Sequence, residues 1–125
     1  MTDQQASKSD VEVNAGDQAK INRFARLNNQ LEETTEELKS RKKDLENIND
    51  ASDEIMLLDD SVAVPYPFFW FLKAVQSKLE SVKSGLEKEI TDLQLRHDDI
   101  KSQMNQLKLE LYGKFGSNIN LDPDE

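Results

Sequence analysis

The chain has 125 residues and a net charge of −9, from 16 basic and 25 acidic side chains. Apolar residues make up 36% and charged residues 33%, which is typical of long solvated helices with a narrow apolar stripe. The acidic balance disfavours nucleic acid as a partner, and the lack of cysteine excludes disulfides and cysteine-ligated zinc. No segment resembles a signal peptide or reaches the roughly 20 apolar residues that span a bilayer. We therefore expect a soluble, intracellular protein without a membrane partner, located in the cytoplasm, with a nuclear location left open.

The first half of the chain predicts one long helix. Residues 1–12 are polar and predict a disordered tail. Asn14 can cap a helix over residues 14–57, because Asp17 lies three residues later and can bond back to it. Apolar residues then recur with heptad spacing, which predicts a coiled-coil stripe of Ile21, Phe24, Leu27, Leu31, Leu38, Leu45, Ile48 and Ile55. The alternate positions of this stripe are expected to be the polar Asn28, Thr35, Lys42 and Asn49.

The second half repeats this pattern after a short connecting segment, residues 58–73. Val62-Ala63-Val64, followed by Pro65-Tyr66-Pro67, predicts an edge strand or extended turn. A second helix is expected over 74–112, ended by Gly113 and Gly116, with a tail over 113–125. Its stripe comprises Val75, Leu79, Val82, Leu86, Ile90, Leu93, Ile100, Met104, Leu107 and Leu111.

Two heptad stretches of similar length around a proline-containing segment predict that the chain reverses there. The expected fold is mainly α. It is an antiparallel two-helix coiled-coil hairpin over residues 13–122, with an edge strand or extended turn at its base.

The run Phe68-Phe69-Trp70-Phe71-Leu72 is too apolar to be buried by two helices alone. One interpretation is a plug that packs the base of the hairpin. Another is a contact surface for other subunits, because exposed aromatic patches usually mark interfaces. A membrane anchor is disfavoured, since the flanks lack basic clusters.

Apolar residues also gather where the two chain ends would meet. They could complete the coiled coil and fold the tail back, or stay exposed on frayed ends and bind unfolded chains. This end cluster comprises Phe24, Leu27, Leu107, Leu111, Tyr112, Phe115, Ile119 and Leu121.

No motif for catalysis or cofactor binding is visible in the sequence. His97 is the only histidine and lies on the second stripe, where a flanking role is expected rather than metal ligation. We expect neither an enzyme nor a catalytic, metal or cofactor site.

Several stretches resemble the beta-class subunits of the prefoldin co-chaperone family. Matching residues include Asp17-Gln18, Ile21 to Arg26, Asp50-Ala51, Glu54 to Leu57 and Pro65-Tyr66. The most specific match is Leu111-Tyr112-Gly113-Lys114-Phe115-Gly116-Ser117-Asn118-Ile119-Asn120-Leu121. The resemblance covers about 13–66 and 86–122.

This resemblance implies a coiled-coil hairpin with a short β-hairpin, incomplete in this sequence, at its base. It also implies that such subunits join alpha- and beta-class partners through their β-hairpins, forming a double barrel from which six coiled coils hang. It implies that the tips hold non-native proteins, such as actin and tubulin, and pass them to the cytosolic chaperonin without ATP hydrolysis. The end cluster would then be the client-binding tip. The subunit interface would comprise Val62, Ala63, Val64, Tyr66, Phe68, Phe69 and Trp70.

The sequence departs from that family after Pro65-Tyr66. The family usually has a second strand with an Ile-Gly-x-x-Phe pattern, which residues 67–74 replace without a glycine and with a shorter connection. We hypothesise an altered form, from splicing or from the gene model, whose contribution to the barrel is impaired, because a β-hairpin needs two strands. The alternative function is a structural coiled-coil adaptor or tether.

Overall fold

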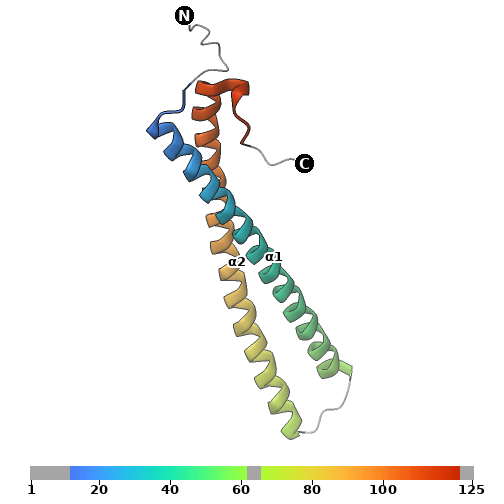
Figure 1. The fold of residues 1–125 in the computed structure, drawn as a ribbon. Coiled ribbons are helices and arrows are strands. Elements are labelled where there is room, and N and C mark those ends of the chain that lie inside the picture. Colours follow the sequence, from blue (N-terminus) through green and yellow to red (C-terminus); the bar gives the residue numbers. More distant parts are fainter. Residues whose placement is uncertain (1–11, 62–65, 122–125) are drawn as a thin grey trace, which may run out of the picture. The chain divides into compact units, whose positions relative to one another are not determined.

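The computed structural model describes residues 12–61 and 66–121. They form helix α1 (Ala15–Ser61), helix α2 (Tyr66–Phe115) and the short 3-10 helix η2 (Gly116–Asn118) (Figure 1). No strand occurs among these residues. The predicted mainly α class is therefore confirmed, whereas the tail over 1–12 lies almost wholly outside the described residues.

Helix α1 begins with the predicted cap. The backbone N–H of Asp17 donates to Oδ1 of Asn14 at 2.8 Å, and the N–H of Asn14 donates to Oδ2 of Asp17 at 3.1 Å. This reciprocal pair satisfies two backbone donors that the first turn of a helix leaves without intrahelical partners. The local spacing of Asn14 and Asp17 thus sets where the helix starts.

Helix α2 begins at Tyr66, eight residues before the predicted start at 74. Proline is tolerated in the first helical turn because the N–H that it lacks has no intrahelical partner there. Pro67 therefore stands inside the start of α2 and does not prevent it. The aromatic run is helical, so no second strand follows Pro65-Tyr66 in the described residues. The predicted first strand, 62–64, lies outside them.

Helix α2 ends at Phe115, three residues after the predicted end. Gly113 remains helical, whereas Gly116 adopts a positive φ of 58°. This left-handed conformation is unfavourable for residues with a Cβ and commonly terminates helices. Gly116, rather than Gly113, is thus the residue that stops α2.

The chain divides into two compact units, each of which contains a segment of both helices. We call residues 12–33 with 96–121 the terminal unit, and Thr34–Leu95 the central unit. In the terminal unit Lys20 pairs with Glu110 and Arg23 with Gln103, so the two segments run in opposite directions. Its core consists of Phe24, Leu27, Ile100, Met104 and Leu107, with Leu31 and Leu121 packed against it.

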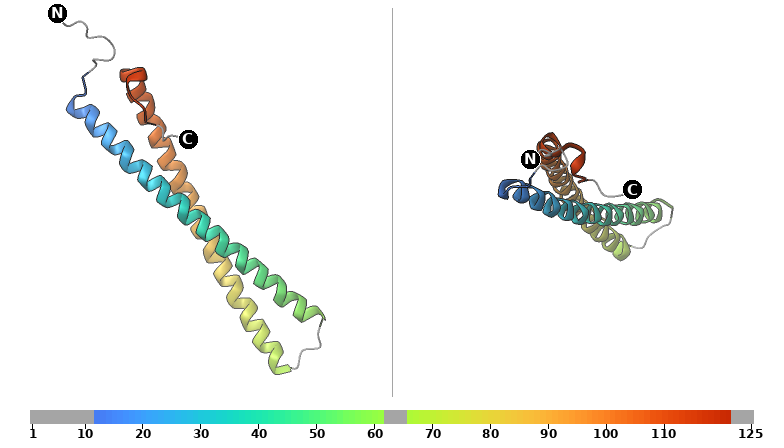
Figure 2. Two further views of the ribbon diagram at one scale, coloured as in Figure 1. Left: turned by 45° about the vertical axis from the view of Figure 1, so that its right-hand side comes forward. Right: turned by 45° about the horizontal axis from the view of Figure 1, so that its top comes forward.

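In the central unit the green α1 segment and the yellow α2 segment can be followed in Figure 2. Leu38 and Leu72 are its buried apolar side chains among those described. Val82, predicted in the stripe, is 37% exposed and belongs to the surface.

Two of the four polar positions predicted in the α1 stripe differ from the structure, whereas the other two, Asn28 and Asn49, are half-buried. Thr35 and Lys42 are exposed, whereas Thr34 is 1% exposed and Arg41 is half-buried. The reason is that the second apolar position of a heptad follows the first by three residues, not four. Thr34 is small enough to be buried at this contact, and Arg41 reaches Asp44 with an ion pair of 3.2 Å.

Candidate functional site

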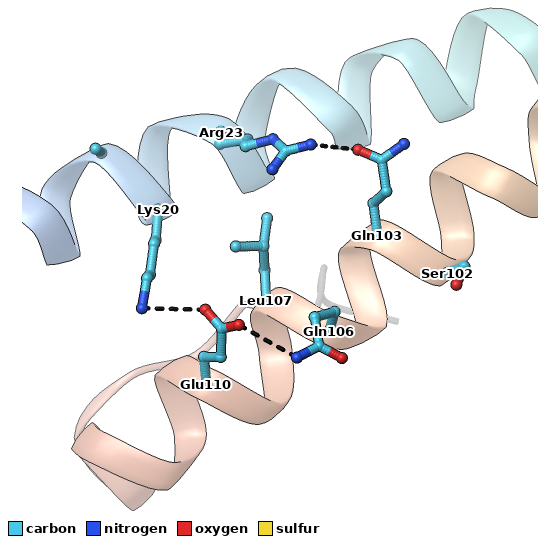
Figure 3. Close-up of a pocket in the computed structure, with 8 residues that line it drawn as sticks. Lys20, Arg23, Ser102, Gln103, Gln106, Leu107 and Glu110 are labelled. Atoms are coloured by element: carbon cyan, nitrogen blue, oxygen red, sulfur yellow. Dashed lines mark hydrogen bonds and ion pairs between the residues drawn. The ribbon is translucent and has the colours of Figure 1, made fainter.

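A groove of about 480 Å³ lies between α1 and α2 in the terminal unit. Lys20 Nζ is 3.0 Å from Oε1 of Glu110, and Arg23 donates to Oε1 of Gln103 (Figure 3). Leu107 rises from α2 between these two polar contacts, toward α1. The groove therefore has polar side chains bridging the helices above an apolar floor.

Two carboxylates of this unit are held in their charged form. A hydrogen bond from Lys20 is the main reason that the pKa of Glu110 is lowered, and a second one from Gln106 acts in the same direction. The pKa of Asp17 is lowered chiefly by its hydrogen bond from Lys114 and then by the backbone N–H of Asn14. Both ion pairs link α1 to α2, so they stabilise the antiparallel pairing of this unit.

Five of the eight end-cluster residues are buried in the terminal unit. Their exposed fractions lie between 1% and 6%, and they are Phe24, Leu27, Leu107, Leu111 and Phe115. These side chains complete the helix pair, as the first interpretation of the end cluster expects. Their predicted contact with client proteins stays a prediction.

The other three end-cluster residues, Tyr112, Ile119 and Leu121, are half-buried. The hydroxyl of Tyr112 accepts a hydrogen bond of 3.0 Å from the backbone N–H of Leu121, which also packs against the core. The residues after η2 are therefore folded back onto the helices. They are the part of the cluster nearest to solvent.

An exposed aromatic patch lies in the first turns of α2 in the central unit. It consists of Phe68, Phe69, Trp70 and Phe71. Phe68, Trp70 and Phe71 are 56–60% exposed and Phe69 is 36% exposed, whereas Leu72 is buried. Phe68 contacts Phe71, and Phe69 contacts Trp70, in edge-to-face pairs with ring centroids 5.9 Å apart. The rings thus contact one another without being covered by the rest of the unit.

Three further exposed apolar residues lie in the last turns of α1 in the same unit: Met56, Leu57 and Leu58, at 49–66% exposure. The sequence interpretation assigned them no role. Their signal in the sequence was that they follow Ile55 directly, and no single helical stripe can bury four consecutive apolar residues. Of the predicted interface residues, Val62, Ala63 and Val64 lie outside the described residues, and only the backbone of Tyr66 is described.

His97 is half-buried, with Nδ1 3.2 Å from Oδ1 of the neighbouring Asp98. Within residues 12–61 and 66–121, no group of three metal-ligating side chains is assembled. No helix among them is long and apolar enough to cross a bilayer.

Paired antiparallel helix segments, an apolar stripe and an exposed aromatic patch define a coiled-coil protein. The family model described as "Prefoldin subunit" matches residues 18–68. Prefoldin subunit 4 of Homo sapiens is 42% identical, covering 99% of this chain and 97% of that protein. Prefoldin subunit 4 of Bos taurus is 41% identical with the same coverage, and that of Saccharomyces cerevisiae is 35% identical over 94% of this chain. No solved structure matches.

The chain belongs to the prefoldin subunit family. It is accordingly a co-chaperone subunit that associates with other prefoldin subunits, and it is not an enzyme. The resemblance predicted from the sequence is confirmed.

The family match ends at Phe68, within the segment that departs from the family pattern. The alignment with the human relative spans 130 positions, more than the 125 residues present, so it contains gaps in this chain. At least five positions of that alignment are therefore gaps in this chain.

Proposed function

We propose that this subunit assembles with its alpha- and beta-class partners through the aromatic patch, and that the assembled hexamer captures unfolded proteins such as actin and tubulin. Delivery of these clients to the cytosolic chaperonin would take place in the cytoplasm without ATP hydrolysis. The observation that carries the proposal is the exposure of three neighbouring aromatic side chains at 56–60% each. Aromatic residues are enriched in the buried centres of interfaces and supply much of their binding energy.

The helical start of α2 favours a particular mode of assembly. Strand pairing requires unpaired backbone N–H and C=O groups along an extended edge. From Tyr66 onward the backbone is helical, and a helix uses these groups internally. Side-chain packing of Phe68 and Phe71 against a partner is therefore the contact that this segment can offer. It replaces the second strand of the family pattern.

Client capture is proposed for the end cluster. Tyr112, Ile119 and Leu121 would contact clients first, because they are half-buried and the Leu121 backbone is held by its hydrogen bond to the Tyr112 hydroxyl. The five buried members would become available only where the helix ends separate, and helix ends are the least stable parts of such structures. Each apolar contact is weak, so binding is multivalent across several subunits and reversible.

Reconstitution with partner subunits tests this function. Light scattering should show that the assembled complex suppresses aggregation of denatured actin without nucleotide. Replacing Ile119 and Leu121 by serine should weaken this suppression. The matched control, Leu95→Ser with Leu109→Ser, changes two leucines that are 65% and 71% exposed, and it should leave suppression unchanged.

Two results would overturn the proposal. Equal suppression of actin aggregation by both double variants would show that the end cluster does not bind clients. An assembled complex that leaves actin aggregation unaltered would support a structural adaptor.

A further inference from the structure

Three arginines from the two helices of the terminal unit surround one groove. Arg23 and Arg26 lie on α1 and Arg96 on α2, and together they line a volume of about 310 Å³. Its walls include the buried side chains of Leu27 and Ile100. The groove combines cationic rims with an apolar floor, inside a chain whose net charge is −9.

The residues that line the groove carry a net positive charge, because three arginines face one carboxylate. Asp17 is paired with Lys114 and Glu110 with Lys20. Asp99, the acidic residue that lines the groove, accepts a hydrogen bond of 2.8 Å from the neutral amide of Gln103 and keeps its negative charge. Among the described residues, the guanidinium groups of Arg26 and Arg96 form no ion pair or hydrogen bond, and both residues are exposed. Arg23 donates to a neutral amide, that of Gln103.

We propose that this arginine groove binds acidic segments of unfolded polypeptides, with client carboxylates on Arg26 and Arg96 and neighbouring apolar side chains over Leu27 and Ile100. Guanidinium groups bind carboxylates with two parallel hydrogen bonds, which makes arginine better suited than lysine to this contact. The proposal rests on the proposed function, because it names the chemistry of the clients that the terminal unit prefers.

A polypeptide fits this groove better than a nucleic acid. The continuous phosphate charge of a nucleic acid would be repelled by an acidic chain, and it would need a longer basic surface than three arginines supply. A polypeptide can place one or two carboxylates at the groove while its other side chains remain neutral. Charge complementarity is thus local, which is what an acidic protein needs in order to hold an acidic client.

The test uses the full chain assembled with its partner subunits. Fluorescence anisotropy would measure binding of a labelled, unstructured peptide of alternating Asp and Leu, and of its counterpart with Asn in place of Asp. The variant is Arg26→Glu with Arg96→Glu. The control is Lys42→Glu with Lys43→Glu, which reverses two exposed charges on α1 in the central unit. Arg23 is left intact because it links the two helices.

We expect the arginine variant to bind the Asp peptide at least about tenfold more weakly than wild type. Binding of the Asn peptide should be unchanged, and the lysine variant should behave as wild type. Added salt should weaken binding of the Asp peptide to wild type. Arg26→Gln with Arg96→Gln removes the two charges without reversing them, so it serves as the variant if charge reversal disturbs assembly. It should also bind the Asp peptide more weakly than wild type.

Equal binding of the Asp peptide by the wild-type complex and both arginine variants would overturn the proposal that this groove binds acidic segments. Stronger displacement of this peptide by single-stranded DNA than by unlabelled Asp peptide would overturn the choice of occupant. Anisotropy measures peptide binding at the groove even where the complex fails to suppress actin aggregation. Failure of this inference is therefore distinguishable from failure of the proposed function.

Discussion

Lys114 at the end of α2 reaches Asp17 at the start of α1, with Nζ 2.5 Å from Oδ2. Asp17 is 6% exposed and also accepts the capping hydrogen bond from the backbone of Asn14. One carboxylate therefore caps α1 and joins the first turn of α1 to the last turn of α2. The Lys114 ammonium lies 5.5 Å from the Phe115 ring centroid, which adds an attraction that does not depend on Asp17.

The Asp17 pair predicts a pH-dependent stability. The pKa of Asp17 is lowered in the folded protein relative to about 3.9 in an unfolded chain, so its stabilising contribution is complete above the unfolded pKa. It is lost as pH falls through the folded pKa. Lys114→Met removes the main cause of the lowered pKa. We expect the difference in free energy of unfolding between wild type and this variant to shrink as pH falls below about 4.

Denaturant unfolding at several pH values would measure this difference. The control is Lys101→Met, since Lys101 is exposed and has no ion pair among the described residues. Its difference from wild type should stay flat with pH. A cost of Lys114→Met that is as large at pH 3 as at pH 7 would show that Asp17 is not the partner that matters.

Two glycines are predicted to respond oppositely to alanine. A Cβ on Gly85 would have no neighbouring atom within 4 Å, and this residue lies inside α2. Gly85→Ala should raise the free energy of unfolding by about 1 kcal/mol, because alanine is the better helix former. Gly116→Ala should lower it by about 1–2 kcal/mol, because the φ of 58° is strained for a residue with a Cβ. Urea titration of both variants would measure these changes. A change of the same sign in the free energy of unfolding for both variants would contradict this account.

The helix ends could be predicted where the signal is local and unambiguous. Asn14 and Asp17 bond to each other across three residues, so their spacing alone specified the cap. Pro67 was ambiguous, because proline ends one helix and can equally occupy the first turn of the next. The sequence therefore predicted that the chain reverses but placed the start of α2 eight residues too late.

The arginine groove could not be predicted from the sequence. Arg23 and Arg26 are close in sequence, but Arg96 joins them only through the register of α1 against α2. Heptad spacing identifies the stripe on each helix without saying which residues lie opposite each other. Ion pairs such as Lys20 with Glu110 reveal that register only once both helices are placed.

Burial in the end cluster predicts a large difference between two nearby leucines. Leu111 is 1% exposed and Leu109 is 71% exposed. Leu111→Ala should lower the free energy of unfolding by about 2–5 kcal/mol, because it removes a packed side chain and leaves a cavity. Leu109→Ala should change it by less than about 0.5 kcal/mol. Thermal unfolding followed by circular dichroism would decide, and similar melting temperatures for the two variants would refute the packing described here.

The proposed role of the aromatic patch is tested most directly by native mass spectrometry of the chain mixed with its partner prefoldin subunits. Wild type should enter a hexamer. Phe68→Ser with Phe71→Ser should remain outside it while keeping its helical circular dichroism, because these rings are 56% and 60% exposed and contribute little to the fold. Hexamers formed equally well by this variant would contradict assembly through the helical start of α2.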